Sequence, residues 1–279
     1  MSVRMTQRVA AVQMRSGADV AANLARADAL LGTAAAAGAV LAVLPENFAA
    51  MGASPPAQEG SGLPPAHAER PGAGPIQRAL AASARAHRLW LVGGTIPLVA
   101  ADGRARAASL VFDADGVQVA RYDKMHLFDV EVPDGERHRE SAMIEPGGEL
   151  VVVDTPVGRL GLSVCYDLRF PELYRGLVAQ AATLFAVPAA FTATTGAAHW
   201  EVLLRARAIE DQCYVVAAAQ HGEHPGGRRT HGDSMIIDPW GTVLARQATG
   251  EGVVCADIDP ARLVGLRRSF PVLVHRRLQ

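Results

Sequence analysis

The sequence predicts an α/β fold with mixed sheets, and three observations lead to this prediction. Strand-like and helix-like segments alternate along the whole chain of 279 residues. Several strand candidates are continuous apolar runs, which is typical of strands buried on both faces. Turn residues join other strand candidates into hairpins, so antiparallel pairs should accompany parallel ones. Helices outside and a second sheet inside would bury such strands. No break in composition divides the chain, so we expect one domain over residues 1–279.

Five segments are predicted to be helices, because apolar residues recur in them at helical spacing. Pro75 and Pro171 begin two of these segments, at a position where the missing N–H of proline costs little. Gly38 follows the first segment, where a glycine commonly ends a helix. The predicted helices are residues 19–37, 75–87, 171–180, 198–211 and 260–268.

The strand candidates are of two kinds. Five apolar runs predict strands in the interior of a sheet: residues 8–13, 39–45, 89–96, 182–187 and 213–219. Three further pairs flank turn residues and predict hairpins: 107–113 with 117–122, 149–154 with 159–164, and 233–238 with 242–247. Residues 51–75 are rich in Gly, Pro, Ala and Ser and predict a long surface loop.

The composition excludes several classes of protein. The chain carries 27 basic and 28 acidic side chains, so no net charge favours nucleic acid or an anionic membrane as a partner. No apolar stretch approaches the ~20 residues of a membrane-spanning helix, and the N-terminal residues show no signal-peptide pattern. The three cysteines include no C-x-x-C pair and predict neither a disulfide framework nor a zinc site. We expect a cytoplasmic protein with reduced cysteines.

Three reactive residues occupy equivalent places in the predicted fold. Glu46, Lys124 and Cys165 each follow the C-terminal end of a predicted strand, which is the edge of an α/β sheet where active sites form. A thiolate attacks a carbonyl, a carboxylate takes the thiol proton and later returns it, and an ammonium holds the charge on the carbonyl oxygen. Cys165 on a tight turn before a helix should be exposed, and the helix N-terminus should favour its thiolate. The backbone N–H of Tyr166 is a second candidate donor to the carbonyl oxygen.

Structural roles remain open for the same residues. A cysteine at a strand end is often a small core residue, and Cys213 and Cys255, inside strand-like runs, are expected to be just that. A lysine at a strand end is often solvated. However, Lys124 is the only lysine among the 27 basic residues, which indicates that an arginine does not serve in its place.

The histidines offer a competing mechanism, because a Cys-His pair is common in hydrolases. His126 and His199 stand outside any local motif and are expected to have structural or substrate-contact roles. His221, His224 and His231 share a Gly-rich segment whose spacing matches no common metal site, so we expect a solvated loop and no metal. In the same loop, Arg228 and Arg229 are candidates to bind a substrate carboxylate.

The residues around the three reactive side chains resemble the signature segments of the nitrilase superfamily of carbon–nitrogen hydrolases. The matching segments are LPENF (44–48), RYDKMHLFDVEV (121–132), GLSVCYDLRFPELYR (161–175), GAAHWEVLLRARAIEDQCYVVAAAQ (196–220) and SMIIDPWGTVLA (234–245). The resemblance implies a four-layer αββα sandwich and hydrolysis of an amide through a thioester. It implies that Glu46 is the general base, Lys124 the oxyanion stabiliser and Cys165 the nucleophile. It also implies a second glutamate that orients the lysine, which we assign to Glu140, with Glu136 close by in the sequence.

Within the superfamily, the segment 212–220 is most similar to amidases that hydrolyse deaminated glutathione to 2-oxoglutarate and cysteinylglycine. This resemblance implies a small-molecule amide substrate, which Phe191, Arg228 and Arg229 are expected to contact, and no cofactor. It also implies a homodimer or higher homo-oligomer, paired through the helices that follow Cys165 and precede Cys213. An ω-amidase acting on α-ketoglutaramate-type monoamides is the alternative. A catalytically silent binding module on the same fold is a third possibility, which the presence of Glu46, Lys124 and Cys165 disfavours.

Overall fold

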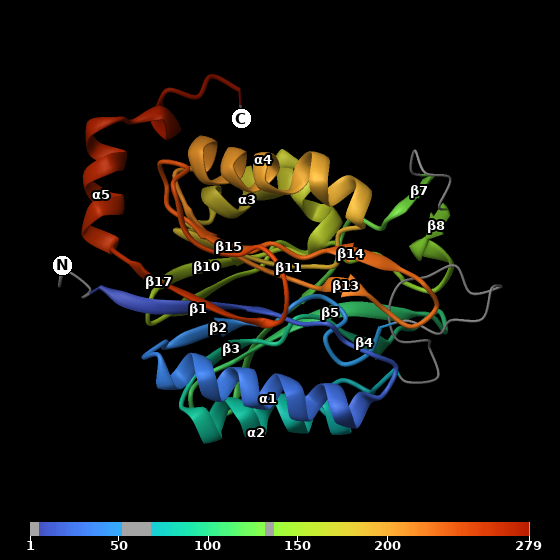
Figure 1. Ribbon diagram of the computed structural model, residues 1–279. Coiled ribbons are helices and arrows are strands. Elements are labelled where there is room, and N and C mark those ends of the chain that lie inside the picture. Colours follow the sequence, from blue (N-terminus) through green and yellow to red (C-terminus); the bar gives the residue numbers. More distant parts are fainter. Residues whose placement is uncertain (1–5, 52–67, 132–136, 279) are drawn as a thin grey trace.

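The computed structural model describes residues 6–51, 68–131 and 137–278, and it has four layers. Helices α1 (Val20–Ala36) and α2 (Pro75–His87) cover the outer face of one sheet (Figure 1). Helices α3 (Pro171–Ala179) and α4 (Ala193–Asp211) cover the outer face of the other, and the two sheets pack against each other. The predicted αββα sandwich is confirmed.

The first sheet has seven strands in the order β17-β1-β2-β3-β5-β4, with β6 also paired to β5. It is mixed, because β1 runs parallel to β2 and antiparallel to β17. Its strands are β1 (Gln7–Gln13), β2 (Leu41–Val43), β3 (Trp90–Val92), β4 (Ile96–Val99), β5 (Ala105–Phe112), β6 (Gln118–Asp123) and β17 (Gly252–Ile258).

The second sheet has six strands in the order β16-β15-β12-β11-β10-β9. Strands β10, β11 and β12 are parallel, and the outer strands pair with them antiparallel, so this sheet is mixed too. Its strands are β9 (Val152–Thr155), β10 (Gly158–Leu162), β11 (Leu184–Ala189), β12 (Tyr214–Ala219), β15 (Ser234–Ile237) and β16 (Val243–Gln247). The three predicted hairpins are confirmed as β5–β6, β9–β10 and β15–β16.

Two small hairpins and one further helix complete the chain. The hairpins are β7 (Asp129–Glu131) with β8 (Arg137–Arg139), and β13 (His221–Glu223) with β14 (Arg229–His231). Helix α5 (Pro260–Ser269) lies near the C-terminus. No helix in the described ranges is both long and apolar enough to cross a membrane.

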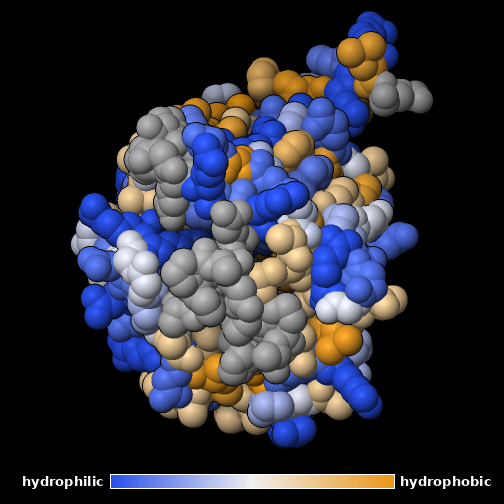
Figure 2. Space-filling model, turned by 90° about the vertical axis from the view of Figure 1, so that its right-hand side faces the viewer, coloured by the Kyte–Doolittle hydropathy of each residue, from blue (hydrophilic) through white to orange (hydrophobic). Residues whose placement is uncertain are grey.

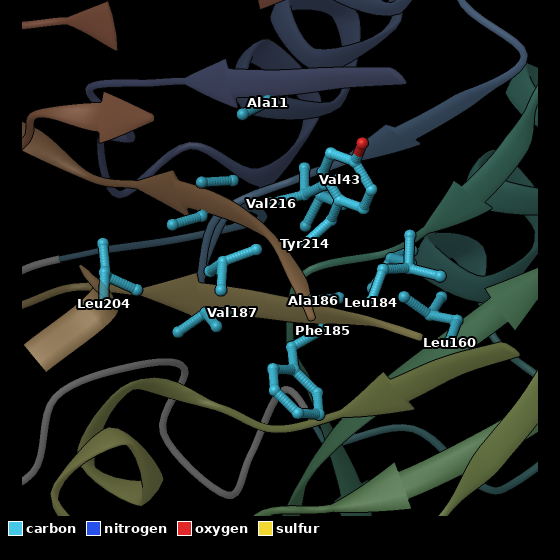
Figure 3. Packing of buried hydrophobic residues seen from close by; sticks show 14 of the residues in the cluster. Ala11, Val43, Leu160, Leu184, Phe185, Ala186, Val187, Leu204, Tyr214 and Val216 are labelled. Atoms are coloured by element: carbon cyan, nitrogen blue, oxygen red, sulfur yellow. The ribbon is translucent and has the colours of Figure 1, made fainter. Parts of the chain in front are cut away.

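The main hydrophobic core lies between the two sheets and continues under α3 and α4. Ala11 and Val43 of the first sheet lie beside Val187 and Val216 of the second, all four without solvent exposure (Figure 3). Burying a side chain of this size contributes about 1.5–3 kcal/mol. This packing explains why strands of both sheets carry apolar side chains on both of their faces. Each sheet is covered by a helix layer on its outer face and by the other sheet on its inner face.

Three differences from the prediction bear on the candidate site. The run 89–96 is two strands, β3 and β4, which pair with successive parts of β5. Gly94 interrupts them with a φ of +58°, and a Cβ there would lie 2.1 Å from the carbonyl oxygen of Pro45. Helix α4 begins five residues earlier than expected, because the Thr192 side chain caps it by accepting a hydrogen bond from Thr195 N.

Much of the predicted 51–75 loop, residues 52–67, lies outside the described residues. The third difference is at 221–231, which is not a solvated loop but the β13–β14 hairpin. Its His224 is buried, with Nδ1 2.9 Å from the carbonyl oxygen of Ser16 and Nε2 2.7 Å from Oγ1 of Thr230. The contact with Ser16 connects the hairpin to the segment that follows β1, and the contact with Thr230 lies within the hairpin.

Candidate active site

The ends of three strands bring the predicted reactive residues to one end of the sandwich. Glu46 follows β2, Lys124 follows β6, and Cys165 follows β10. The pairing of β2, β3, β5 and β6 makes β6 run in the same direction as β2, so Glu46 and Lys124 emerge on the same side. Figure 2 views this end of the molecule, whose surface outside the grey region mixes hydrophilic and hydrophobic residues.

The loop carrying Glu46 packs against the break between β3 and β4. Thr95 Oγ1 accepts a hydrogen bond of 2.9 Å from the backbone N–H of Asn47. Gly94 lets the chain approach Pro45 more closely than any larger residue would allow. The break between β3 and β4, which the apolar pattern of the sequence did not reveal, therefore fixes the position of the loop that carries Glu46.

Lys124 lies at the centre of the site with 1% of its surface exposed. Its Nζ donates to Oε1 of Glu46 at 2.8 Å and to Oε1 and Oε2 of Glu140 at 2.9 and 2.8 Å. Glu140 is itself held by the backbone N–H of Phe128, which donates to Oε2 at 2.7 Å. All three ammonium hydrogens thus have carboxylate partners. Glu136, the neighbouring candidate, lies outside the described residues.

The charges of the site shift one another's pKa values. Burial by itself would lower the pKa of Lys124, but the adjacent Glu140 and Glu46 outweigh it, so the pKa is raised well above its usual value. For Glu140 the effects are reversed: burial raises the pKa of its carboxyl, and the nearby Lys124 ammonium only partly opposes this. Lys124 therefore stays an ammonium at neutral pH.

Cys165 stands on a tight turn directly after β10. Its φ is +48°, a conformation that costs a non-glycine residue energy. A 3₁₀ turn spans Cys165–Arg169, and α3 begins only at Pro171. The sharp turn agrees with the prediction from the sequence, but the predicted exposure is wrong: Cys165 is buried, because it packs into the core beneath the turn.

The expectation of a favoured thiolate is wrong. Burial and the hydrogen-bonded Glu46 carboxylate raise the pKa of the Cys165 thiol well above its usual value. Lys124 and the backbone N–H of Ala190 lower it, but to a smaller extent. No α-helix begins at Cys165, so no helix N-terminus offsets the burial. Cys165 therefore rests as a thiol that is hydrogen-bonded to the Glu46 carboxylate.

A cavity opens above Cys165. Its described lining includes the predicted residues Glu46, Lys124, Cys165, Tyr166, Phe191 and Arg228, together with Phe128, Arg169, Ala190, Thr192 and Thr195. Arg229 is not part of this lining and is exposed on β14. The two neighbouring arginines, which the sequence did not distinguish, therefore have different surroundings.

Arg169 and Arg228 are cavity-lining cations that form no ion pair with a carboxylate in the described part of the chain. The Arg169 guanidinium lies 5.2 Å from the Phe191 ring centre and contacts Nδ1 of His199 at 3.2 Å. Arg228 Nη2 donates to the carbonyl oxygen of Ala190 at 3.1 Å. The Nε of Arg228 is buried and has no partner within the described ranges. Arg169 was missed from the sequence, although it lies only four residues after Cys165.

The histidines do not form a Cys-His pair in this arrangement. No histidine of the described residues lines the cavity. His126 contacts Asp167, with Nδ1 2.7 Å from Oδ1, and stacks on Phe170. Across residues 6–51, 68–131 and 137–278, no cluster of three or more His, Cys, Asp or Glu residues could hold a metal ion.

The family model for carbon–nitrogen hydrolases matches residues 8–268 of this sequence. The chain belongs to the carbon–nitrogen hydrolase family. The resemblance to the nitrilase superfamily is confirmed by Nit3 of Saccharomyces cerevisiae, a member of branch 10 of that superfamily. Its structure matches with a TM-score of 0.85 and 28% identity, over 99% of this chain and 98% of Nit3.

Two more relatives of this carbon–nitrogen hydrolase bear on its chemistry. A deaminated glutathione amidase of Synechocystis is 44% identical over 271 residues, which are 96% of this chain and 97% of the relative. An amidase from Nesterenkonia sp. AN1 matches with a TM-score of 0.77 and 27% identity, over 94% of this chain and 97% of that one. That structure is of a mutant of the amidase with a glutamate replaced by glutamine, and it shows the result of Michael addition of acrylamide at the active-site cysteine.

Proposed function

We propose that this carbon–nitrogen hydrolase is an amidase that cleaves deaminated glutathione with Cys165 as its nucleophile. The observation that carries the proposal is one buried cluster of Cys165, Glu46, Lys124 and Glu140, opening on a cavity with two arginines that lack carboxylate partners in the described residues. The name of the Synechocystis relative and the reactive cysteine of the Nesterenkonia amidase support it.

The charge of the cavity favours an anionic substrate. Glu46 and Glu140 more than balance Lys124, and the resting Cys165 thiol is neutral. Arg169 and Arg228 then leave an excess of positive charge in a partly buried site, which a substrate carboxylate would neutralise. Deaminated glutathione carries two carboxylates, one on the acyl part and one on the departing dipeptide. A neutral amide would leave both guanidinium groups without an anion.

Acylation begins when the Cys165 sulfur attacks the amide carbonyl and the thiol proton passes to Glu46. The carbonyl oxygen becomes an oxyanion, which Lys124 stabilises, with the backbone N–H of Tyr166 as a second donor. Collapse of the tetrahedral intermediate breaks the C–N bond, and Glu46 returns the proton to the leaving amine. A water molecule then attacks the thioester carbonyl while Glu46 takes one of its protons. The C–S bond breaks, Glu46 returns that proton to the sulfur, and the acid and the Cys165 thiol are released.

The hydrogen bonds of Lys124 give the proton transfer a second effect. In the resting site, all three N–H groups of Lys124 point to carboxylate oxygens. When Glu46 takes the thiol proton, it loses its negative charge and its hold on Lys124 weakens. The released N–H then stabilises the oxyanion as it forms, while Glu140 keeps the ammonium in place. This assigns Glu140 the role of orienting Lys124.

A side-by-side assay with deaminated glutathione and α-ketoglutaramate tests the substrate. We expect a higher kcat/KM for deaminated glutathione, and a reversed preference would make the protein an ω-amidase. Labelling with a thiol-reactive amide analogue, followed by mass spectrometry, tests the enzyme class independently. Covalent mass on Cys165 is expected, and its absence together with absent hydrolysis would indicate a silent binding module.

Assembly and location are part of the same proposal: a single-domain, cytoplasmic homo-oligomer. The oligomer is supported by exposed apolar side chains on α4, Val202 and Ile209, and by the nearby exposed Trp240. Reduced, unpaired cysteines at 165, 213 and 255 agree with the cytoplasm. Light scattering coupled to size exclusion should give at least twice the mass of 29.3 kDa, and a monomer at micromolar concentration would contradict it.

A further inference from the structure

The carboxylate of Asp167 is fully buried two residues after Cys165 and has four hydrogen-bond contacts, three of them accepted from N–H or O–H donors. Its Oδ1 accepts from the backbone N–H of His126 at 2.9 Å and lies 2.7 Å from Nδ1 of the same histidine. Its Oδ2 accepts from the hydroxyl of Tyr122 at 2.6 Å and from the backbone N–H of Val164 at 2.9 Å.

These partners lie on both sides of Lys124 and directly before Cys165. Tyr122 and His126 are two residues before and two residues after Lys124. The Tyr122 hydroxyl also accepts a hydrogen bond of 3.3 Å from the backbone N–H of Met125. One carboxylate thus fixes the whole turn that carries the ammonium, although it lies 41 residues from His126 in the sequence.

The same carboxylate fixes the turn that carries the nucleophile. The backbone N–H of Asp167 donates to the carbonyl oxygen of Val164 at 3.0 Å, while the side chain accepts from the Val164 N–H. Two hydrogen bonds between residues 164 and 167 therefore enclose Cys165, whose φ is +48°. A strained conformation persists only where its surroundings hold it, and this pair of bonds does so.

We propose that Asp167 is a positioning residue that holds the Lys124 turn and the Cys165 turn at a fixed separation. It touches no reacting atom, and it acts by keeping the ammonium where the oxyanion forms beside the sulfur. The proposal rests on the catalytic roles of Lys124 and Cys165 proposed above. A carboxylate suits this place because the Tyr122 hydroxyl and the backbone N–H groups of His126 and Val164 all donate to it, and both of its oxygens accept.

The variant Asp167→Asn tests this role, because asparagine has the same shape but replaces one acceptor oxygen by a donating NH₂ group. Whichever oxygen is replaced, one backbone N–H, that of His126 or that of Val164, then faces another donor. We expect kcat for the amide substrate to fall at least about tenfold with KM changed less than about twofold, since small displacements of catalytic groups are costly. Tyr122→Phe removes one donor to Asp167 and the acceptor of the Met125 N–H, while the backbone donors of His126 and Val164 remain. It should lower kcat by a smaller factor than Asp167→Asn, and it provides the test if Asp167→Asn does not fold.

The matched control is Asp238→Asn. Asp238 is equally buried and accepts from the backbone N–H groups of Trp240 and Thr242, in the β15–β16 turn at the opposite end of the sheet. This variant should lower the melting temperature and leave kcat per folded molecule unchanged.

The proposal is overturned if Asp167→Asn and Tyr122→Phe both keep kcat within about twofold, or if Asp238→Asn lowers kcat by the same factor as Asp167→Asn. Cys165→Ala is run in parallel. Activity retained by that variant would refute the proposed function itself, whatever the result at Asp167.

Discussion

Nζ of Lys124 lies 2.8 Å from Oε1 of Glu46, although 78 residues separate them in the sequence and both are buried. Removing one partner of a buried ion pair leaves an uncompensated charge in the interior, which typically lowers the free energy of unfolding by about 3–5 kcal/mol. Glu140 provides a second negative partner for the same ammonium. Changes at these three residues should therefore affect both catalysis and stability, and the two effects must be measured separately.

Cys165→Ala should abolish hydrolysis and leave the fold intact. Without the sulfur no thioester forms, and a methyl group fits the space of a thiol. Product formation per folded molecule, with folding checked by circular dichroism, is the measurement. Cys255→Ala is the control, since Cys255 lies on β17, outside the residues that line the cavity. Near-normal turnover of Cys165→Ala would remove Cys165 from the mechanism.

Lys124→Arg should lose activity although it keeps the charge. A guanidinium is larger and planar, and it cannot place three donors on Glu46 and Glu140 within a pocket filled by a compact ammonium. We expect kcat to fall by about 10²–10³, the usual effect of losing an oxyanion donor. Arg88→Lys, at an exposed ion pair with Asp115, should have no effect on kcat. A loss below tenfold at Lys124 would contradict the oxyanion role.

Glu46→Gln should lower kcat by about 10²–10⁴ because glutamine cannot act as a base. The same change should lower the pKa of the Cys165 thiol, since the Glu46 carboxylate is one of the causes that raise it. The pH dependence of iodoacetamide alkylation should accordingly shift to lower pH in the variant, while hydrolysis is lost. A shift to higher pH, or hydrolysis that survives, would show that another group takes the thiol proton.

Arg228→Ala and Arg229→Ala should separate the two neighbouring arginines. Arg228 lines the cavity with an unpartnered Nε, and Arg229 is exposed outside it. Loss of a charged hydrogen bond costs ~1.5–3 kcal/mol. Arg228→Ala should therefore raise KM for deaminated glutathione at least about tenfold and leave a neutral amide unaffected. Arg229→Ala should change neither. Equal effects of the two variants would place the carboxylate elsewhere.

Asp211 should make the protein less stable as the pH rises from about 4 to about 7. Burial raises the pKa of Asp211 to about 7 from its usual 3.8, and Arg175, with Nη1 3.0 Å from Oδ1, only partly opposes this. Between pH 4 and 7, the Asp211 carboxyl is therefore protonated in the folded protein and ionised in the unfolded chain. This difference contributes stability that is fully present below pH 4 and is lost as the pH rises through 7.

Denaturant titrations of wild type and Asp211→Asn at pH 4 to 8 measure this effect. The variant should gain on the order of 3 kcal/mol relative to wild type between pH 4 and 7.5, and little below pH 4. Asp154→Asn, at an exposed carboxylate, is the control. A difference between wild type and variant that is independent of pH would contradict the assignment.

The sequence alone determined the segments and the family. Helices α1 and α2 and the three hairpins follow from spacing, caps and turn residues, all of which act over a few residues. Glu46, Lys124 and Cys165 were identified because each follows an apolar run, and a strand end is a local feature. The break at Gly94 was missed, because its cause is the close approach of Pro45, which is distant in sequence.

Only the tertiary structure decided how these residues act on one another. It placed two carboxylates on Lys124, separated the surroundings of Arg228 and Arg229, and revealed Arg169 in the cavity. It also put Asp167 between the turns that carry Lys124 and Cys165. It also reversed the expectation for the Cys165 thiol, whose pKa is raised. The physical reason is that periodicity and caps are local, whereas desolvation and Coulomb interactions depend on distances between segments that only the packing of the two sheets sets.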